Sequence, residues 1–357
     1  AIREAALLGE RGYDTTLYSV IKPREPWRGL LDGVDLRYVL DVGDGLVGEA
    51  VSRGAAGFRG LPDIPDYLVC HNLPGAQLGY RARRRHGTPY VAYVHDATAY
   101  PVAGSPFTAL FGMYSPEVDE ADLGYLGRLG LALERRWLGG AEAVVANSGR
   151  TARELRRRHG LAVDVLYPTL VGCRDAPPRE APGEDFLVVQ RLDPHPTYDV
   201  LERLLERVPE MRVVVAGHSG ADYLESRLRD RFERFGDRVR FVVDPSDDEL
   251  AALYSDALAY LQPGIENFNM SALEAASAGC PIVVAEESGI AELFEDYPLF
   301  VPADDEAGFE RAVRRFVEDP DAARRLGRLA AETAAAYDDD YHVDTLDSLL
   351  DPRGGAA

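Results

Sequence analysis

Helical and strand-like patterns of apolar residues alternate along almost the whole chain. Four segments of the first half have apolar residues three or four apart, the helical spacing: 1–12, 75–87, 125–141 and 151–160. Short apolar runs typical of buried strands lie between them, at 15–20, 66–72, 89–96, 142–148 and 163–168. This alternation predicts an α/β fold with mainly parallel sheets, because each parallel strand is reached through a crossover helix.

The alternation stops once and then resumes. Residues 173–184 are dense in proline, glycine and charge and have no apolar period, so we expect a linker between two domains there. The first domain then covers residues 1–172 and the second covers residues 185–335. A helix over residues 336–350 could cross back to the first domain. We therefore predict two Rossmann-like, doubly wound domains that face a central cleft and hold a ligand between them.

The charge of the chain disfavours one class of partner. It has 60 acidic residues against 39 basic ones, which gives a net charge of -21, and Lys22 is the only lysine. So negative a chain repels nucleic acids and anionic membranes as a whole. An acidic, lysine-poor surface fits a high-salt cytoplasm and a halophilic source, although a GC-rich genome would also replace lysine by arginine. The high-salt origin is a hypothesis.

Cysteine and histidine spacings give no sign of a metal site. The three cysteines, Cys70, Cys173 and Cys280, are far apart in the sequence, so we expect reduced, packed thiols. No run approaches the roughly 18 apolar residues that a spanning helix needs, and the start has no pattern of a signal sequence. We expect a cytoplasmic protein with at most peripheral contact with the inner membrane face, and with neither metal nor cofactor.

Residues 263–284, PGIENFNMSALEAASAGCPIVV, combine a helix start with two carboxylates, Glu266 and Glu274. A helix N-terminus exposes unpaired N–H groups and carries a partial positive charge, so it binds phosphate readily. A carboxylate would repel that phosphate at contact, but it accepts hydrogen bonds well from hydroxyl groups. Two other interpretations stay open: Ser271 and Glu274 also fit a capping box, and Glu266 also fits a solvated loop.

The segment GIENFNMSALEAASAGCPIVVAEESGIAEL resembles the signature of the group 1 (family 4) retaining glycosyltransferases, which have the GT-B fold. GTPYVAYVHD, NSGRTARELRRRHG, QRLDP and VVVAGHSG follow the order and spacing of the same family, so the resemblance covers nearly the whole chain. It implies an enzyme that moves a hexosyl group from a nucleotide-diphosphate sugar, such as a UDP or GDP sugar, to a glycan, lipid-linked or small-molecule acceptor. The family retains the anomeric configuration and needs no metal.

By this resemblance, both domains contribute residues to the site. Glu266 would bind the donor sugar, and Glu274 the nucleotide ribose. His95 ends a predicted strand where the family has a catalytic-site histidine, and Asp96 could orient its ring. The donor diphosphate would meet Arg191 and the amides of Phe268, Asn269 and Met270, with Asn267, His195 and Gly217 as further candidates.

The chain departs from the family pattern at three places. Pro196 stands where the family has a lysine that grips the diphosphate, and His195 or an arginine from elsewhere could compensate for the lost cation. Asn267 and Asn269 replace two glycines, and asparagine tolerates the left-handed backbone that such a turn requires. The family's Gly-rich loop would lie upstream of Ala1.

Three functions fit the sequence. Glycosyl transfer is the leading one, and a non-catalytic partner or nucleotide-sugar-binding subunit is the alternative that Pro196 supports best. A nucleotide-sugar epimerase fits less well, because the two glutamates are spaced as in transferases. His71 is a weaker candidate near the acceptor. The arginines at 81, 83–85 and 156–158 fit either solvated helix faces or a docking place for a phosphate-bearing lipid. The oligomeric state is not predicted.

Overall fold

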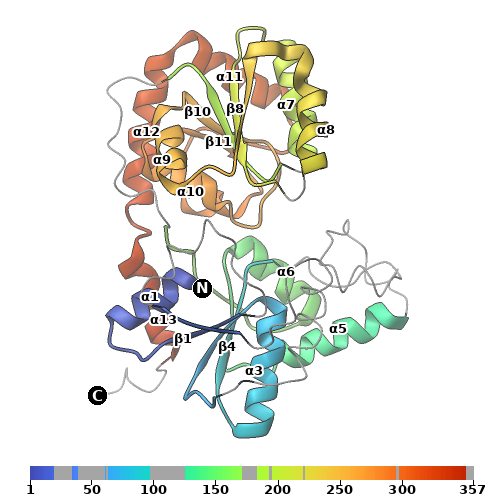
Figure 1. Ribbon diagram of the computed structural model, residues 1–357, viewed down its shortest axis with the longest axis vertical. Helices are drawn as coiled ribbons and strands as arrows, with labels where there is room; N and C mark the ends of the chain where they lie inside the picture. Colours follow the sequence, from blue (N-terminus) through green and yellow to red (C-terminus); the bar gives the residue numbers. More distant parts are fainter. Residues whose placement is uncertain are drawn as a thin grey trace. The chain divides into compact units, whose positions relative to one another are not determined.

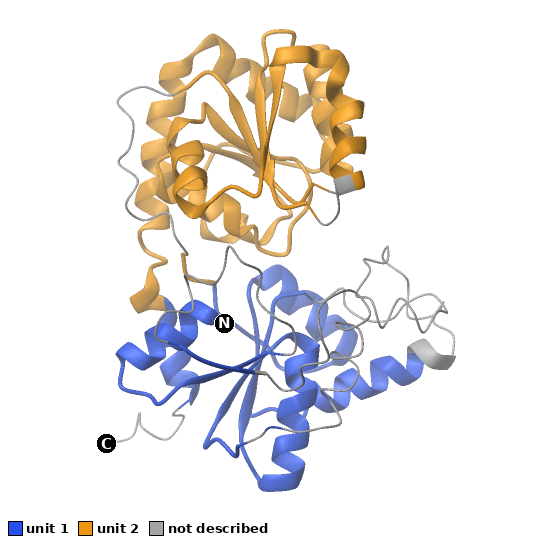
Figure 2. Cartoon of the chain, in the orientation of Figure 1, with its two compact units in different colours: residues 1–167, 342–357 blue, residues 168–341 orange. Residues whose placement is uncertain are grey.

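A computed structural model describes residues 1–19, 34–38, 61, 63–96, 125–170, 183–192, 195–219, 222–294 and 297–350 (Figure 1). The chain divides into two compact units (Figure 2). Unit 1 consists of Ala1–Tyr167 and His342–Ala357, and unit 2 of Pro168–Tyr341. Unit 2 is therefore inserted into unit 1, and the last helix of the chain returns to the unit in which the chain begins.

Unit 1 contains a four-stranded parallel sheet in the order β3-β4-β5-β6 and a separate parallel pair formed by β1 and β2. Its strands are β1 (Thr16–Ser19), β2 (Asp35–Tyr38), β3 (Leu68–His71), β4 (Tyr90–Val94), β5 (Ala143–Ala146) and β6 (Asp164–Val165). Its helices are α1 (Ile2–Glu10), α3 (Asn72–His86), α5 (Tyr125–Leu138), α6 (Gly149–His159) and the main part of α13 (Asp339–Leu350).

Strand β4 divides the core of unit 1 into two faces. All five of its residues are buried, as expected for a parallel strand covered on both sides. Tyr90, Ala92 and Val94 pack toward α3 and α5, while Val91 and Tyr93 pack with apolar residues of α1 and α13. The period of two along the strand thus places every second residue under the helices from the two ends of the chain.

Unit 2 contains a six-stranded parallel sheet in the order β12-β11-β10-β7-β8-β9. Its strands are β7 (Phe186–Val189), β8 (Val213–Gly217), β9 (Val239–Val243), β10 (Ala259–Gln262), β11 (Ile282–Ala285) and β12 (Phe300–Val301). Its helices are α7 (Pro196–Arg207), α8 (Asp222–Phe232), α9 (Asp247–Asp256), α10 (Met270–Ser277), α11 (Glu306–Glu318) and α12 (Pro320–Ala334), with short 3-10 segments η4 (Glu233–Arg238) and η5 (Gly289–Leu293).

The order of strands in unit 2 reverses between β7 and β10. The chain proceeds from β7 through β8 to β9 on one side of the sheet, and from β10 through β11 to β12 on the other. At such a switch point the connections leave in opposite directions, and a crevice opens beyond the carboxyl ends of the two strands. Strands β8, β10 and β11 are buried at every residue, so the loops at the carboxyl ends of these strands are anchored in a well-packed core.

The α/β fold with parallel sheets is confirmed, and the local differences are small. Strand β6 has two residues, shorter than the predicted run at 163–168, and the pattern at 290–296 gives the 3-10 segment η5. Cys70 and Cys280 are free and buried, as expected. Cys173 and most of the predicted linker lie outside the described residues. In the part of the chain that the structure describes, no helix is long and apolar enough to cross a bilayer.

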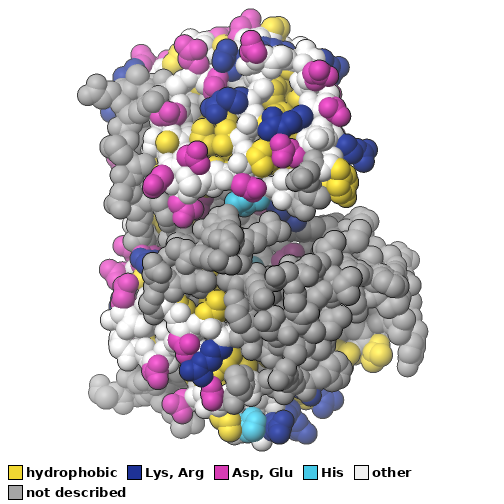
Figure 3. All heavy atoms as spheres, viewed as in Figure 1, with side chains coloured by type: hydrophobic (Ala, Val, Ile, Leu, Met, Phe, Trp, Pro, Cys, Tyr) yellow, Lys and Arg dark blue, Asp and Glu magenta, His cyan; other side chains and the backbone are white. Residues whose placement is uncertain are grey.

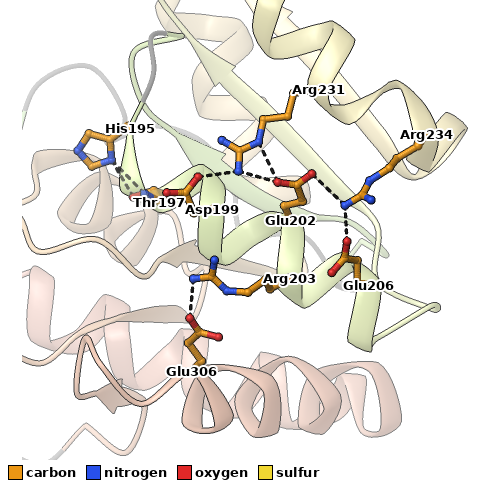
Figure 4. A network of polar contacts seen from close by, with 9 residues as sticks. All are labelled: His195, Thr197, Asp199, Glu202, Arg203, Glu206, Arg231, Arg234 and Glu306. Carbon is orange, nitrogen blue, oxygen red and sulfur yellow. Dashed lines mark hydrogen bonds and ion pairs between the residues drawn. The ribbon is translucent and has the colours of Figure 1, made fainter.

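Acidic side chains and arginines are interspersed over the face of unit 2 that Figure 3 shows. Figure 4 shows ion pairs that join α7 to its neighbours. Arg231 of α8 contacts Asp199 and Glu202 of α7, at 2.6 Å each. Arg234 of η4 also binds Glu202, at 2.9 Å. Helix α7 is thus fixed on its outer side by charge as well as by its buried apolar face.

Candidate functional site

The first group of candidate residues in unit 2 lies at the switch point of its sheet. Gln190 and Arg191 follow β7, and Gln262 is the last residue of the neighbouring strand β10. The Gln262 amide Nε2 donates to Gln190 Oε1 at 3.0 Å, so the two strand ends are joined by their side chains. Gly217 ends β8, and a Cβ there would lie 1.8 Å from the Gln190 carbonyl oxygen. Only glycine therefore fits at position 217, where the absence of a side chain lets the ends of β7 and β8 lie close together.

Glu266 lies in a hydrogen-bonded loop, which contradicts the alternative of a merely solvated carboxylate. Its Oε1 accepts from Gln262 Nε2 at 3.2 Å. Its backbone N–H donates to Ser288 Oγ at 3.0 Å, and its carbonyl accepts from the N–H of Gly289 at 3.1 Å. Ile290 continues this pairing by donating to the Phe268 carbonyl at 2.8 Å. The loop between β10 and α10 is therefore held along its length by the turn that follows β11.

Gln262 also connects Glu266 to the start of α7. Gln262 is 2% exposed, and its Oε1 accepts from the hydroxyl of Thr197 at 2.8 Å. Thr197 Oγ1 in turn lies 3.0 Å from His195 Nδ1 (Figure 4). Since Gln262 donates to the Glu266 carboxylate, its oxygen must face Thr197. The Thr197 hydroxyl proton is then used on Gln262, and the hydroxyl oxygen is left to accept from His195.

His195 is the N-cap of α7 and has two contacts that compete for one nitrogen. The N–H of Thr197 points to Nδ1 at 3.3 Å, which requires a bare Nδ1, whereas the 3.0 Å contact with Thr197 Oγ1 requires a proton there. The second contact is shorter and agrees with the orientation of Gln262. It therefore indicates a proton on Nδ1. Pro196 is the first residue of α7 and is exposed, so the position of the family lysine is at a helix start beside His195.

The start of α10 differs in part from the sequence interpretation. Asn269 is the N-cap, with a left-handed backbone (φ 88°), and its Oδ1 accepts from the N–H of Ala272 at 3.0 Å. Asn269 therefore occupies the glycine-like conformation that we expected, whereas Asn267 does not have a positive φ. The capping box proposed for Ser271 and Glu274 is wrong, since Ser271 already lies inside the helix. Asn269 Nδ2 is buried and has no hydrogen-bond partner among the described residues.

Glu274 is the fifth residue of α10, two positions further along the helix than the capping box would place it. Its Oε2 accepts from the Tyr254 hydroxyl at 2.8 Å. Burial raises the pKa of Glu274 to about 7, while the Tyr254 hydrogen bond lowers it and the charge of Asp247 raises it. The residue as a whole is half-buried. The charge of Glu274 therefore changes near neutral pH.

A second cluster lies in unit 1 at the carboxyl ends of β3 and β4. His71 ends β3 and His95 follows β4, and both lie on the face that α1 and α13 cover. His95 Nε2 is 2.8 Å from His71 Nδ1, and the two rings are stacked at 5.1 Å. The backbone of His95 is held on both sides, because its N–H donates to Asn72 Oδ1 at 2.8 Å and its carbonyl accepts from Asn147 Nδ2 at 3.1 Å. Asp96 follows as a partly buried residue.

Two members of this cluster were missed in the sequence. Glu4 of α1 is 5% exposed and His342 of α13 is 1% exposed. Glu4 Oε2 lies 2.9 Å from His71 Nε2, and Glu4 Oε1 lies 2.8 Å from His342 Nε2. The signal for Glu4 was its place on the buried face of α1 with Leu7 and Leu8, three and four residues on. No sequence pattern pointed to His342.

Burial determines the charges in this cluster. It lowers the pKa of His95 to about 3, and the adjacent His71 lowers it as well. It also lowers the pKa of His71, with Glu4 acting in the opposite direction. For Glu4, burial alone would raise the pKa, but His71 and the hydrogen bond with His342 hold it well below the ordinary value. Glu4 is therefore ionised and His95 is neutral at neutral pH.

Two family descriptions match the chain. Residues 3–168 match the glycosyl transferase 4-like domain, and residues 174–333 match the glycosyl transferases group 1. A D-inositol 3-phosphate glycosyltransferase of Streptomyces avermitilis is 29% identical over 316 residues, which cover 80% of this chain and 65% of the relative. One from Nocardia farcinica is 28% identical over 324 residues, covering 84% and 68%. The chain thus spans about two thirds of the length of these curated relatives.

Solved structures agree on the fold. The structure of Anabaena HepE in complex with UDP and glucose has a TM-score of 0.74 and 15% identity, covering 98% of this chain and 94% of that one. The lipopolysaccharide outer core galactosyltransferase WaaB in its apo form has a TM-score of 0.62 and 13% identity, covering 99% and 96%. This likeness establishes the two-domain GT-B fold that the sequence predicted.

Proposed function

The chain belongs to the group 1 glycosyl transferases, and from this premise we propose that it moves a hexosyl group from a nucleoside diphosphate to an acceptor hydroxyl with retention of configuration. The observation that carries the proposal is the connected set of Gln262, Glu266 and Thr197 at the switch point of the unit 2 sheet. Parallel sheets bind ligands at this point, and here three loops bring polar groups to it.

The donor diphosphate is proposed to bind between the start of α10 and the end of β7. The first N–H groups of α10 are not used within the helix and carry its positive dipole end. Arg191, exposed after β7, would add a permanent charge and paired hydrogen bonds. The buried amide Nδ2 of Asn269 adds a donor beside the same helix start. These groups would stabilise the charge that develops on the leaving diphosphate.

His195 is proposed to replace the lysine that the family has at the position of Pro196. With Nδ1 donating to Thr197 Oγ1, a second proton on Nε2 would make the ring a cation next to the lysine position. Gln262 and Thr197 would link that cation to Glu266, so the same chain of hydrogen bonds would orient the groups for the phosphate and for the sugar. The sequence interpretation named both ends of this chain but not its middle.

The two glutamates are proposed to bind hydroxyl groups. Glu266, fixed by Gln262 and by the turn at Ser288, would accept from a hydroxyl of the donor sugar. Glu274 would accept from the ribose in its ionised form. In this arrangement no side chain attacks the sugar. The acceptor hydroxyl would approach from the side on which the diphosphate leaves, and its proton would pass to the leaving diphosphate. The protein would position the reactants and stabilise the charge that develops.

The donor and acceptor are also proposals. The UDP and glucose bound in the Anabaena HepE structure favour a UDP sugar as the first donor to test. The names of the curated relatives add D-inositol 3-phosphate to the glycan and lipid-linked acceptors. The experiment incubates the full-length protein with UDP and GDP sugars, with and without these acceptors, and measures nucleotide release. Glu266→Gln should reduce release by about 100-fold or more, while Arg240→Gln, on the exposed side of β9, should leave it unchanged.

A non-catalytic nucleotide-sugar-binding subunit is the second candidate, because Pro196 removes the family's cation. Titration calorimetry with UDP and UDP-glucose separates the two. Binding that Glu274→Ala abolishes, without transfer to any acceptor, would favour this second candidate. Release that depends on Glu266 favours the transferase, and neither binding nor release would contradict both.

A further inference from the structure

The hydrogen-bond partners of His342 determine where its protons are. Its Nδ1 lies 2.8 Å from the carbonyl oxygen of Tyr167, which can only accept, so Nδ1 must carry a proton. Its Nε2 lies 2.8 Å from Glu4 Oε1. Because Glu4 is ionised and also only accepts, Nε2 must carry a proton too. His342 is therefore an imidazolium paired with the buried Glu4 carboxylate.

The same argument applies to His71 on the other oxygen of Glu4. Nε2 of His71 lies 2.9 Å from Glu4 Oε2, although Oε2 has no well-aligned hydrogen-bond donor. A lone pair on Nε2 would face an anionic oxygen at contact distance, so electrostatics place the proton on Nε2 even at a poor angle. The single negative charge of Glu4 is already balanced by the His342 imidazolium, and burial opposes a second positive ring on the same carboxylate. His71 is therefore neutral, so its Nδ1 is bare and accepts a hydrogen bond.

His95 supplies that hydrogen bond. Its Nε2, 2.8 Å from the bare His71 Nδ1, must carry the proton that joins the two rings. A neutral imidazole has one ring proton, so Nδ1 of His95 is then a hydrogen-bond acceptor. The order of protons runs from the Tyr167 carbonyl through His342, Glu4 and His71 to His95, and each step follows from the one before.

We propose that Glu4, His71 and His342 are positioning residues that hold the ring proton of His95 on Nε2 and present its Nδ1 as an acceptor to a hydroxyl of a sugar substrate at the carboxyl end of β4. The use of Nδ1 at a sugar rests on the proposed function, whereas the position of the proton does not. The backbone contacts of His95 with Asn72 and Asn147 fix the residue, and the network fixes which nitrogen accepts.

Other groups around the network do not alter this order. The Tyr93 ring lies against three of the imidazoles, at 4.3 Å from His95, 5.5 Å from His71 and 6.2 Å from His342, and its hydroxyl donates away to the Leu166 carbonyl at 2.7 Å. Within the described residues no three acidic, histidine or cysteine side chains converge as metal ligands.

Nitrogen NMR of the full-length protein with labelled histidine tests the proton positions directly. In the unaltered protein, His95 should give a one-bond proton–nitrogen signal from Nε2 and none from Nδ1; His95→Gln assigns it. Glu4→Gln should keep the signal, because its amide can accept from His71 and donate to a neutral His342. Glu4→Met and His71→Phe should lose it to exchange with water, since Glu4→Met releases His71 and His71→Phe removes the acceptor.

Activity provides the second measurement. Sugar transfer should fall about tenfold or more in Glu4→Met and His71→Phe and stay within about twofold in Glu4→Gln. A proton on Nδ1 of His95 in the unaltered protein would overturn the inference, as would an unchanged signal in Glu4→Met and His71→Phe. Equal losses of transfer in Glu4→Gln and Glu4→Met would also contradict it. If no sugar is transferred at all, the proposed function fails, and the NMR signals still decide the inference.

Discussion

Each unit contains one buried polar network, and the two networks are built from different kinds of side chain. Unit 1 uses ionisable groups, Glu4 and three histidines, brought together from α1, β3, the end of β4 and α13. Unit 2 uses neutral groups, Gln190, Gln262 and Thr197, with a carboxylate only at the edge. A buried charge is costly unless it is paired, whereas amides and hydroxyls need only hydrogen bonds. The difference predicts unequal responses to mutation, pH and salt.

The largest effect should come from removing the charge at the centre of unit 1. Glu4→Met leaves the buried His71 and His342 without their common acceptor, and removal of one member of a buried ion pair costs about 3 kcal/mol or more in unfolding free energy. Urea denaturation of Glu4→Met against the unaltered protein measures this. Because the folded pKa of Glu4 lies well below 4.5, the stability that it provides is present above that pH and is lost as pH falls. A pH-independent difference would contradict this account.

The corresponding change in unit 2 should cost less. Gln262→Met removes three hydrogen bonds and leaves the Thr197 hydroxyl and Gln190 oxygen without their partner, at about 1–2 kcal/mol. The same denaturation experiment gives the comparison, with no added dependence on acid expected. A cost equal to that of Glu4→Met would show that charge is not what distinguishes the two networks.

The strands that carry both networks could be predicted from the sequence, but which residues contact one another in each network could not. Apolar runs located β4, β7 and β10 within a residue or two, and the strand ends therefore gave His95 and Arg191 as candidates. Glu4 and His342 are 338 positions apart, and their contact depends on how α1 and α13 share one face of the sheet. Local spacing carries no information about such a pairing.

The start of α10 shows a second limit. The pattern Ser271–Glu274 satisfies the capping-box spacing, but Asn269 caps the helix two residues earlier. The Tyr260 hydroxyl of β10 donates to the capping oxygen, Asn269 Oδ1, at 3.1 Å, so a tertiary contact supports this cap. The sequence spacing suggested only the Ser271–Glu274 box, and it carries no information about a contact with Tyr260 of the neighbouring strand.

Glu274 is where unit 2 should respond to pH after all. With a pKa of about 7, it is mostly protonated at pH 6 and mostly ionised at pH 8. If the ionised form binds ribose, UDP affinity should rise up to about tenfold over this interval, the limit for one group that titrates in it. Calorimetry at several pH values measures the change, and Glu274→Gln should give a flat profile.

The stability of the protein should change in the opposite direction to this affinity. The folded pKa of Glu274 lies above 4.5, so folding favours its protonated form and the group lowers stability as pH rises from about 4.5 to 7. Glu274→Gln should therefore gain stability relative to the unaltered protein over that range. A decline with pH in both affinity and stability would contradict the role given to Glu274.

The smallest effect should come from the exposed ion pairs between α7 and α8. Arg231 is 32% exposed and Asp199 53% exposed, so their ion pair is screened by water and salt. Arg231→Met should cost about 0.5 kcal/mol at low salt and less in molar salt. Denaturation at two salt concentrations measures this, with Arg229→Met, which removes a single pair with Glu225, as the control. A cost that grows with salt would exclude simple screening.

The hydrogen bond between His342 and Tyr167 has a consequence for biosynthesis and for protein engineering. Tyr167 is the last residue of unit 1 before unit 2 begins, and His342 is the first residue of unit 1 after unit 2 ends. The Tyr167 carbonyl oxygen and His342 Nδ1 are 2.8 Å apart. A ribosome must therefore synthesise the whole of unit 2 before α13 can pack into unit 1. Conversely, a chain in which a short glycine linker connects residues 167 and 342 should yield unit 1 as an independent domain.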